Sequence, residues 1–209
     1  VKNIIITDQK SFLINKKKLK NKKINIYNNF DSIKKIFKNK KVDYTMSSIS
    51  GFQGLDPTLN IIRFTKTIAI ANKESIICGW CLIQKNLKKF KTEFIPIDSE
   101  HFSIWSLMNK ISTNNLENVY ITASGGPFRK YSLGQFKHIT PKKALKHPNW
   151  SMGKKISIDS ATLMNKVFEV IEAKKIFNLR YKQIEILIHP QSYLHAIIKF
   201  NNGLTKLLI

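Results

Sequence analysis

Residues 43–75 read DYTMSSISGFQGLDPTLNIIRFTKTIAIANKES, and the order of the segments in this stretch indicates the fold class. A strand-like piece leads into a glycine-containing turn, and Pro57 follows in the first turn of a predicted helix. The β-rich run at 67–71 then precedes a helical stretch over about 73–88. Strand, turn, helix, strand and helix in this order are typical of a parallel α/β unit.

Features at both ends of the chain predict that further sequence precedes and follows it. The phosphate-binding fingerprint G-x-G-x-x-G of dinucleotide-binding domains does not occur in the sequence. If the unit belongs to such a domain, we expect its first βαβ segment to precede Val1. The chain also stops on an apolar run at 207–209, so we expect further sequence beyond it.

Composition excludes several classes of protein. The 209 residues suit one large domain or two small ones, and 43% hydrophobic residues exclude a disordered or collagen-like chain. No apolar run approaches the ~18 residues of a membrane span. The net charge of +23 is typical of nucleic-acid binding, yet only three of the 36 basic residues are Arg. We interpret the charge as solvated surface lysines and keep a basic nucleic-acid-binding module as the alternative.

The chain has two cysteines, Cys78 and Cys81, in the motif Cys-Gly-Trp-Cys. This spacing occurs in redox dithiols, but such a dithiol follows a strand and opens a helix. The pair here lies within an apolar stretch, and we expect two partly buried thiols. Two cysteines give no disulfide framework, which indicates a reducing compartment.

A pair of carboxylates follows the apolar run FIPI at 94–97. Asp98 and Glu100 stand two residues apart, and we expect them to point to the same side of a strand end. Carboxylates in this arrangement suit hard cations such as Mg²⁺ or Mn²⁺. A solvated strand terminus is the alternative interpretation of this pattern.

A second group of polar residues lies in a helix that we predict to begin at Ser160. This helix is apolar nearly all round, which indicates burial. Asn165, Glu169 and Glu172 nevertheless share one face, with Lys166 beside them. An amide buried without a partner costs roughly 2–7 kcal/mol in an apolar medium, so this face must meet partners. A metal, phosphate or substrate is one possibility, and an internal ion pair of Lys166 with Glu169 is the other.

Several groups in the second half of the chain are suited to bind a phosphate. Ser124 and the two glycines after it offer a hydroxyl and unobstructed backbone N–H groups. We expect Ser160 to cap the N-terminus of its helix, which carries partial positive charge. With Asn165 and Lys166, these residues form a predicted cradle for a phosphomonoester.

The loop HPNWSMG begins at His147, which is a candidate hydrogen-bond partner of a substrate. Trp150 and Met152 lie between its Pro and its Gly, an arrangement typical of a lid that excludes water on closure. His189 and His195 flank the tripeptide PQS further along the chain. Two histidines without a third ligand do not indicate zinc, and we interpret both as mainly structural.

Six motifs, in order and with sensible spacing, resemble the 1-deoxy-D-xylulose 5-phosphate reductoisomerase family. The similarity runs from about residue 50 to residue 203. The motifs are ANKES at 71–75, PIDSEH at 96–101, SGGPFR at 124–129, HPNWSMGKKISIDSAT at 147–162, MNK at 164–166 and IHPQS at 188–192. Enzymes of this family rearrange the carbon skeleton of their substrate. They then reduce the resulting aldehyde with NADPH to 2-C-methyl-D-erythritol 4-phosphate, in the non-mevalonate isoprenoid pathway.

The resemblance implies a role for individual residues. It implies that three carboxylates, Asp98, Glu100 and Glu169, are ligands of a Mg²⁺ or Mn²⁺ ion and also catalytic residues. It implies Lys73 as a further catalytic residue. Contacts to the substrate are implied for Lys73, Ser99, Glu100, Ser124, His147, Ser160, Asn165, Lys166 and Glu169. Contacts to NADPH are implied for Asn72, Glu74 and Gly153, and the lid is formed by Trp150 and Met152.

The resemblance also implies an α/β and α+β architecture. Residues 1–97 correspond to the second half of a Rossmann-like NADPH-binding domain, and residues 98–209 to a mixed α/β catalytic domain without its C-terminal helical extension. We expect an internal fragment, inactive alone, of a homodimeric enzyme that takes a small phosphorylated sugar and binds neither nucleic acid nor membrane. A bacterial cytoplasm is the expected compartment, with a plastid as the alternative. A non-catalytic remnant of such an enzyme is the remaining alternative function.

Overall fold

The computed structural model forms two compact units, Val1–Phe94 and Ile95–Ile209. It describes residues 1–38, 40–108, 111, 115–147, 149 and 151–209. Among these residues, no helix combines the length and the apolar character that crossing a bilayer requires. The predicted division into an NADPH-binding domain (1–97) and a catalytic domain (98–209) concerns the roles of these parts and stays a prediction.

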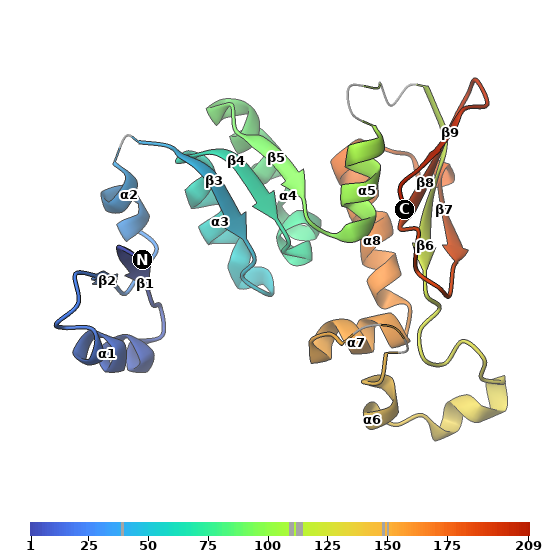
Figure 1. The fold of residues 1–209 in the computed structure, drawn as a ribbon, viewed down its shortest axis with the longest axis horizontal. Helices are drawn as coiled ribbons and strands as arrows, with labels where there is room; N and C mark the ends of the chain where they lie inside the picture. Colours follow the sequence, from blue (N-terminus) through green and yellow to red (C-terminus); the bar gives the residue numbers. More distant parts are fainter. Residues whose placement is uncertain (39, 109–110, 112–114, 148, 150) are drawn as a thin grey trace. The chain divides into compact units, whose positions relative to one another are not determined.

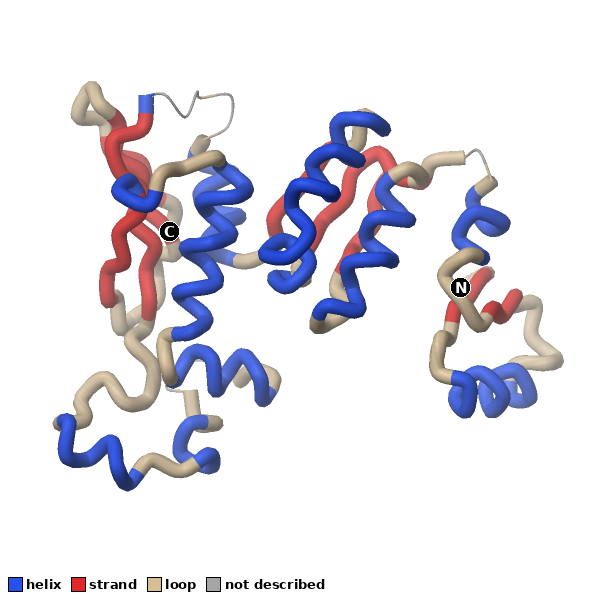
Figure 2. The backbone as a smooth tube through the Cα atoms, turned by 180° about the vertical axis from the view of Figure 1, so that it is seen from behind, coloured by secondary structure: helices blue, strands red, loops and turns tan. Residues whose placement is uncertain are grey.

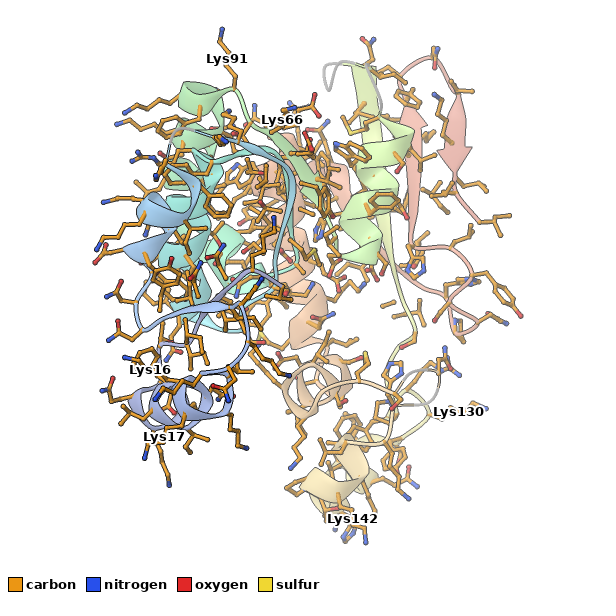
Figure 3. The ribbon with its side chains drawn as sticks, turned by 60° about the vertical axis from the view of Figure 1, so that its left-hand side comes forward. Lys16, Lys17, Lys66, Lys91, Lys130 and Lys142 are labelled. Atoms are coloured by element: carbon orange, nitrogen blue, oxygen red, sulfur yellow. The ribbon has the colours of Figure 1, made fainter. Side chains whose placement is uncertain are left out.

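The first unit opens with a small parallel pair of strands. Asp8 caps the helix between them, because its side chain accepts a hydrogen bond from the Ser11 backbone N–H at 2.8 Å. Lys16 and Lys17 on this helix point away from the ribbon (Figure 3), as expected for solvated lysines. The elements are β1 (Asn3–Ile5), α1 (Gln9–Lys18), β2 (Asn25–Tyr27) and α2 (Ser32–Phe37).

A three-stranded sheet forms the larger part of the first unit. Its order is β3-β4-β5, and β3 pairs with β4 in parallel, with Val42 opposite Thr65. The two helices that follow β3 and β4 lie on the same face of this sheet (Figures 1 and 2). This order of elements confirms the predicted α/β unit. The bounds are β3 (Val42–Ser47), η1 (Phe52–Gly54), α3 (Leu55–Ile62), β4 (Thr65–Ile70), α4 (Lys73–Phe90) and β5 (Glu93–Pro96).

Asn72 fixes the turn between β4 and α4. Its amide N–H groups donate to the backbone carbonyls of Ile49 and Gly51, the second at 2.9 Å. Its side-chain oxygen accepts a hydrogen bond from the Ser75 backbone N–H, so Asn72 also caps α4. The side chain is buried and ties the loop after β3 to the start of α4.

Replacing Asn72 by Ala should lower the free energy of unfolding of the first unit by about 2–3 kcal/mol. The change removes a helix cap and leaves two carbonyls without their donor. Urea unfolding followed by circular dichroism measures the effect. Asn60→Ala is the matched control, since the Asn60 side chain donates to Asp56 one turn earlier on the exposed side of α3. Equal stability of the two variants would contradict the role of Asn72 as an anchor.

A four-stranded sheet of order β7-β6-β8-β9 forms the framework of the second unit. The central strand β6 (Leu116–Ala123) pairs in parallel with β7 (Ile184–Ile188) and antiparallel with β8 (Ala196–Phe200). Strand β9 (Thr205–Leu207) pairs antiparallel with β8 after a turn at 201–203.

Helices α5 (Ser99–Leu107) and α8 (Met164–Phe177) lie beside this sheet (Figure 1). Their apolar side chains join those of the strands in one core, which is why the sheet and the two helices position each other. The buried members are Ile104, Met108, Leu116, Val119, Ile121, Ala173, Phe177, Leu179, Ala196, Ile198 and Phe200.

The segment between β6 and α8 differs from the predicted single helix beginning at Ser160. Helix α7 (Lys154–Ala161) ends just after Ser160, and α8 starts separately. Leu163 joins them with φ 59°, in the left-handed region that L-residues seldom adopt. The prediction was wrong because no Gly or Pro marks this break. Other short helices in this unit are η3 (Leu133–His138), α6 (Pro141–Ala144) and η4 (Tyr181–Gln183).

The two cysteines are more exposed than predicted. Cys78 and Cys81 lie inside α4, beyond its first turn, and both are free and exposed. The expectation of partly buried thiols was therefore wrong, because the apolar residues around them turn to the other side of the helix. A redox dithiol at a helix N-terminus does not match this position.

Candidate functional site

Three carboxylates meet in the second unit. Asp98 precedes the first turn of α5, Glu100 lies within that turn, and Glu169 comes from α8. One oxygen from each lies within 4.8 Å of the others. The expected placement of Asp98 and Glu100 at a strand end was wrong, since β5 has already ended at Pro96. The start of a helix nevertheless brings both carboxylates to the same place as Glu169.

Helix α8 buries charged side chains as well as the apolar residues Ala173 and Phe177. Lys166, Glu169 and Glu172 are buried, with Glu169 only 1% exposed. Val167 and Met164 on the same helix are 48% and 43% exposed. The expectation that the apolar side chains are buried all round the helix was therefore wrong. The polar face is buried because it meets charged partners on α5 and a backbone carbonyl of β6.

Lys166 is the central cation of this polar face. Its ammonium lies 3.1 Å from Glu100 Oε1, pairs with Glu169 and donates to the backbone carbonyl of Thr122. Burial acts to lower the pKa of Lys166, but the charges of Glu100 and Glu169 outweigh it and raise this pKa. The internal ion pair left open by the sequence is therefore present. Asn165 donates a further hydrogen bond to the other oxygen of Glu169.

His101 supports the carboxylates from inside the core. Its Nδ1 lies 3.1 Å from Asp98 Oδ1, and its Nε2 lies 2.9 Å from the backbone carbonyl of Glu169. Burial acts to lower the pKa of His101, but the interaction with Asp98 and the charge of Glu172 raise it to about 9. A protonated His101 forms an ion pair with Asp98 and donates to the Glu169 carbonyl, which ties α5 to α8 at the carboxylate cluster.

A cavity of about 410 Å³ opens beside the cluster. Its lining includes hydroxyl, amide and backbone N–H groups from several segments of the second unit. Predicted site residues among the lining are Asp98, Ser99, Glu100, Ser124, His147, Met152, Ser160, Asn165, Lys166 and Glu169. The second unit therefore brings together carboxylates for a cation and donors for an anion.

The serine and glycine loop after β6 forms one wall of this cavity. Ser124 Oγ lies 3.2 Å from His147 Nε2, and the Gly126 N–H donates to Ser124 Oγ at 3.3 Å. Burial lowers the pKa of His147, which favours its neutral form. The backbone carbonyl of Ser160 lies close to Gly126. Ser160 itself stands near the end of α7, so its expected role as a helix N-cap was wrong.

His195 lies in this site although the sequence indicated a mainly structural role. Its Nδ1 is 3.8 Å from Glu100 Oε1, and it lines the cavity. Burial acts to raise the pKa of Glu100, but the neighbouring His195 and the charge of Lys166 hold it below its usual value. His101 was missed as well, although its position three residues after Asp98 is a recognisable helical spacing.

The other predicted residues divide into three groups. Met152 lines the cavity and Gly153 precedes α7, whereas Trp150 lies outside the described residues. Lys73 and Glu74 begin α4 in the first unit, where Asn72 caps the same helix. The contacts predicted for these residues with a substrate or with NADPH stay predictions.

These features define an α/β protein with a carboxylate cluster of the kind that holds a divalent cation. Two family models match the chain. The model of 1-deoxy-D-xylulose 5-phosphate reductoisomerase matches residues 1–79, and the model of the C-terminal domain of this enzyme matches residues 94–177. The chain belongs to the 1-deoxy-D-xylulose 5-phosphate reductoisomerase family, as its sequence motifs predicted.

Individual relatives agree with this assignment. The chain is 72% identical to the 1-deoxy-D-xylulose 5-phosphate reductoisomerase of Pelagibacter ubique, over all of the chain and 54% of that protein. It is 42% identical to that of Phocaeicola vulgatus, over 97% of the chain and 53% of the relative. The chain therefore spans about half the length of the curated relatives it matches.

Solved structures of the family share the fold. The enzyme from Zymomonas mobilis in complex with NADPH matches with a TM-score of 0.87 and 36% identity, over 100% of this chain and 53% of that one. A reductoisomerase in complex with NADPH, fosmidomycin and magnesium matches with a TM-score of 0.87 and 33% identity, over 99% and 53% of the two chains.

Proposed function

We propose that the protein containing this chain converts 1-deoxy-D-xylulose 5-phosphate to 2-C-methyl-D-erythritol 4-phosphate. The reaction rearranges the carbon skeleton and then reduces the aldehyde with NADPH, and it depends on Mg²⁺ or Mn²⁺. Membership in the family supports this proposal. The observation that carries it is the meeting of Asp98, Glu100 and Glu169 beside a cavity rich in hydrogen-bond donors.

The carboxylate cluster fits a divalent cation. Its three members offer hard oxygen ligands within 4.8 Å of one another, and two of them come from separate elements that a common core holds in place. A bound cation supplies Lewis acidity toward the carbonyl and hydroxyl oxygens of the substrate. Asp98, Glu100 and Glu169 hold it, and Ser99, whose hydroxyl donates to Glu100 at 2.7 Å, orients one ligand.

Hydrogen-bond donors that line the same cavity bind the phosphate group. We assign this role to Ser124, Ser160, Asn165 and Lys166, whose hydroxyl, amide and ammonium groups line the cavity. His147, hydrogen-bonded to Ser124, contacts a neighbouring hydroxyl of the sugar. The substrate is thereby held at both ends, with its reacting carbons between the carboxylates and the phosphate donors.

The remaining residues serve the cofactor and exclude water. Met152 and Trp150 form the lid over the reacting carbons, and Gly153 contacts NADPH. In the first unit, Asn72 and Glu74 contact NADPH, and Lys73 reaches the substrate. The amide of Asn72 is bonded to backbone groups, so Asn72 also holds the shape of this turn.

We further propose that the active protein is a homodimer in the bacterial cytoplasm. Bacterial relatives support the compartment. Strands β7 and β9 expose apolar side chains, including Ile188 at 50% and Leu207 at 47%, and a second copy would cover them.

Titration with Mn²⁺, followed by electron paramagnetic resonance of the free ion, tests the proposed function. We expect saturable binding to the full chain, and a loss of at least about 100-fold in affinity in Asp98→Asn, because replacing even a residue outside the ligand set typically costs 10–100-fold. Asp159→Asn, at a carboxylate that pairs with Lys155 on α7, is the control. NADPH oxidation with the phosphorylated sugar, in a protein of full family length that carries the same substitutions, provides the second readout. Unchanged Mn²⁺ binding in Asp98→Asn contradicts the assignment of the cation site.

A further inference from the structure

Lys166 contacts the carboxylates of the proposed cation site and lines the cavity that holds the proposed phosphate donors. Its ammonium pairs with Glu100 and Glu169 and donates to the Thr122 carbonyl, while its side chain lines the same cavity as the phosphate donors. The side chain is only 7% exposed, so water screens these ion pairs little. One buried cation thus pairs with two of the three carboxylates that are proposed to hold a metal, and its single charge balances only one of their two negative charges.

A divalent cation and the Lys166 ammonium compete for these carboxylates. Two positive charges that share Glu100 and Glu169 at contact distance repel each other, and a low-dielectric surrounding strengthens this repulsion. Binding of the divalent cation therefore weakens the hold of the carboxylates on Lys166. The lysine side chain, with its flexible four-carbon stem, is then available to another anion.

The nearest partner of suitable chemistry is an anionic group bound in the cavity. Asn165 stands next to Lys166 in the chain, and Ser124 and Ser160 line the same space. A phosphate held by these donors offers oxygens that an ammonium bonds strongly. The two interpretations left open by the sequence, an internal ion pair and a phosphate contact, then describe two positions of one side chain.

We propose that Lys166 passes between the metal-site carboxylates and the substrate phosphate, so that binding of the divalent cation and binding of the phosphate strengthen each other. This inference rests on the proposed function, because it uses the same cation and phosphate sites. It adds a distinct consequence, since Lys166 opposes cation binding when no anion is present. A residue that merely supported the carboxylates would favour cation binding instead.

Titrations of the full chain with Mn²⁺ and with methylphosphonate, separately and together, test this coupling. In the wild-type protein we expect each ligand to tighten the other by about fivefold or more, and by the same factor in both directions. In Lys166→Met we expect Mn²⁺ alone to bind at least as tightly as in the wild type, and the mutual tightening to disappear. Lys199→Met removes one positive charge from the same unit, at a pair with Glu117, and should leave both quantities unchanged.

Each outcome separates the inference from the proposed function. If the wild type fails to bind Mn²⁺, the proposed function itself is wrong. If Mn²⁺ binds but Lys166→Met weakens it, or mutual tightening persists in that variant, Lys166 does not pass between the sites. Should Lys166→Met fail to fold, Lys166→Arg decides the question. Its charge is retained on a larger and more rigid group, so we expect weakened coupling without tighter Mn²⁺ binding.

Discussion

Glu169→Gln should abolish metal-dependent turnover in a protein of full family length that carries these residues. The substitution keeps the shape of the side chain and removes one of three negative charges from the cluster with Asp98 and Glu100. It also removes the ion pair with Lys166. We expect Mn²⁺ affinity to fall by at least about 100-fold, which exceeds the usual effect of residues outside the ligand set.

Steady-state kinetics across a range of Mn²⁺ concentrations distinguish loss of the ligand from general damage. Glu117→Gln is the matched control, because Glu117 forms a half-exposed pair with Lys199 at 2.7 Å away from the cluster. Thermal unfolding of both variants checks that the second unit is folded. A near-normal kcat of Glu169→Gln at saturating Mn²⁺ would overturn the assignment of Glu169 as a ligand.

Gly126→Ala should destabilise the second unit by about 2 kcal/mol or more and weaken phosphate binding. Gly126 has φ +68°, a conformation that costs an L-residue roughly 1–2 kcal/mol. An added Cβ would also lie 2.9 Å from the backbone carbonyl of Ser160. Since a backbone atom cannot move as freely as the end of a side chain, the loop carrying Ser124 has to shift away from α7.

Urea unfolding measures the stability change, and isothermal titration with methylphosphonate measures the effect on the site. Gly134→Ala provides the control, because a Cβ at Gly134 meets nothing within 4 Å. We expect that control to lie within about 0.5 kcal/mol of the wild type. Equal stability of the two alanine variants would show that the close approach of Gly126 to α7 is unimportant.

The elements of the fold were largely predictable because their signals are local. The run at 67–71 and the helical spacing after it correspond to β4 and α4, and the apolar runs at 184–188 and 194–200 contain β7 and β8. The boundary between α7 and α8 was not predictable in this way. It depends on Leu163 in a left-handed conformation, which tertiary packing imposes against the preference of the residue.

The candidate site was likewise predictable from the sequence only in part. Residue types and spacing singled out Asp98 and Glu100 as a pair of cation ligands, since hard-cation chemistry favours carboxylates. The family resemblance added Glu169 to them. Residue types and spacing did not indicate that His195 lies 3.8 Å from Glu100, because these residues are far apart in the chain and meet only when β8 packs beside α5. The expected strand-end geometry of Asp98 and Glu100 failed for a related reason, since α5 begins immediately at Ser99.

The sequence by itself therefore determined the α/β unit, the family and the chemical groups of the site. These properties depend on periodicity, motif order and residue type, which the chain carries locally. Only the tertiary structure decided which of these groups are neighbours and how their charges are balanced. The burial of Lys166 between Glu100 and Glu169 is the main example. Its physical reason is that a buried charge requires an opposite charge in contact. Helix α5 must pack against α8 to bring Glu100 to Lys166, and β6 adds the Thr122 carbonyl as a further acceptor.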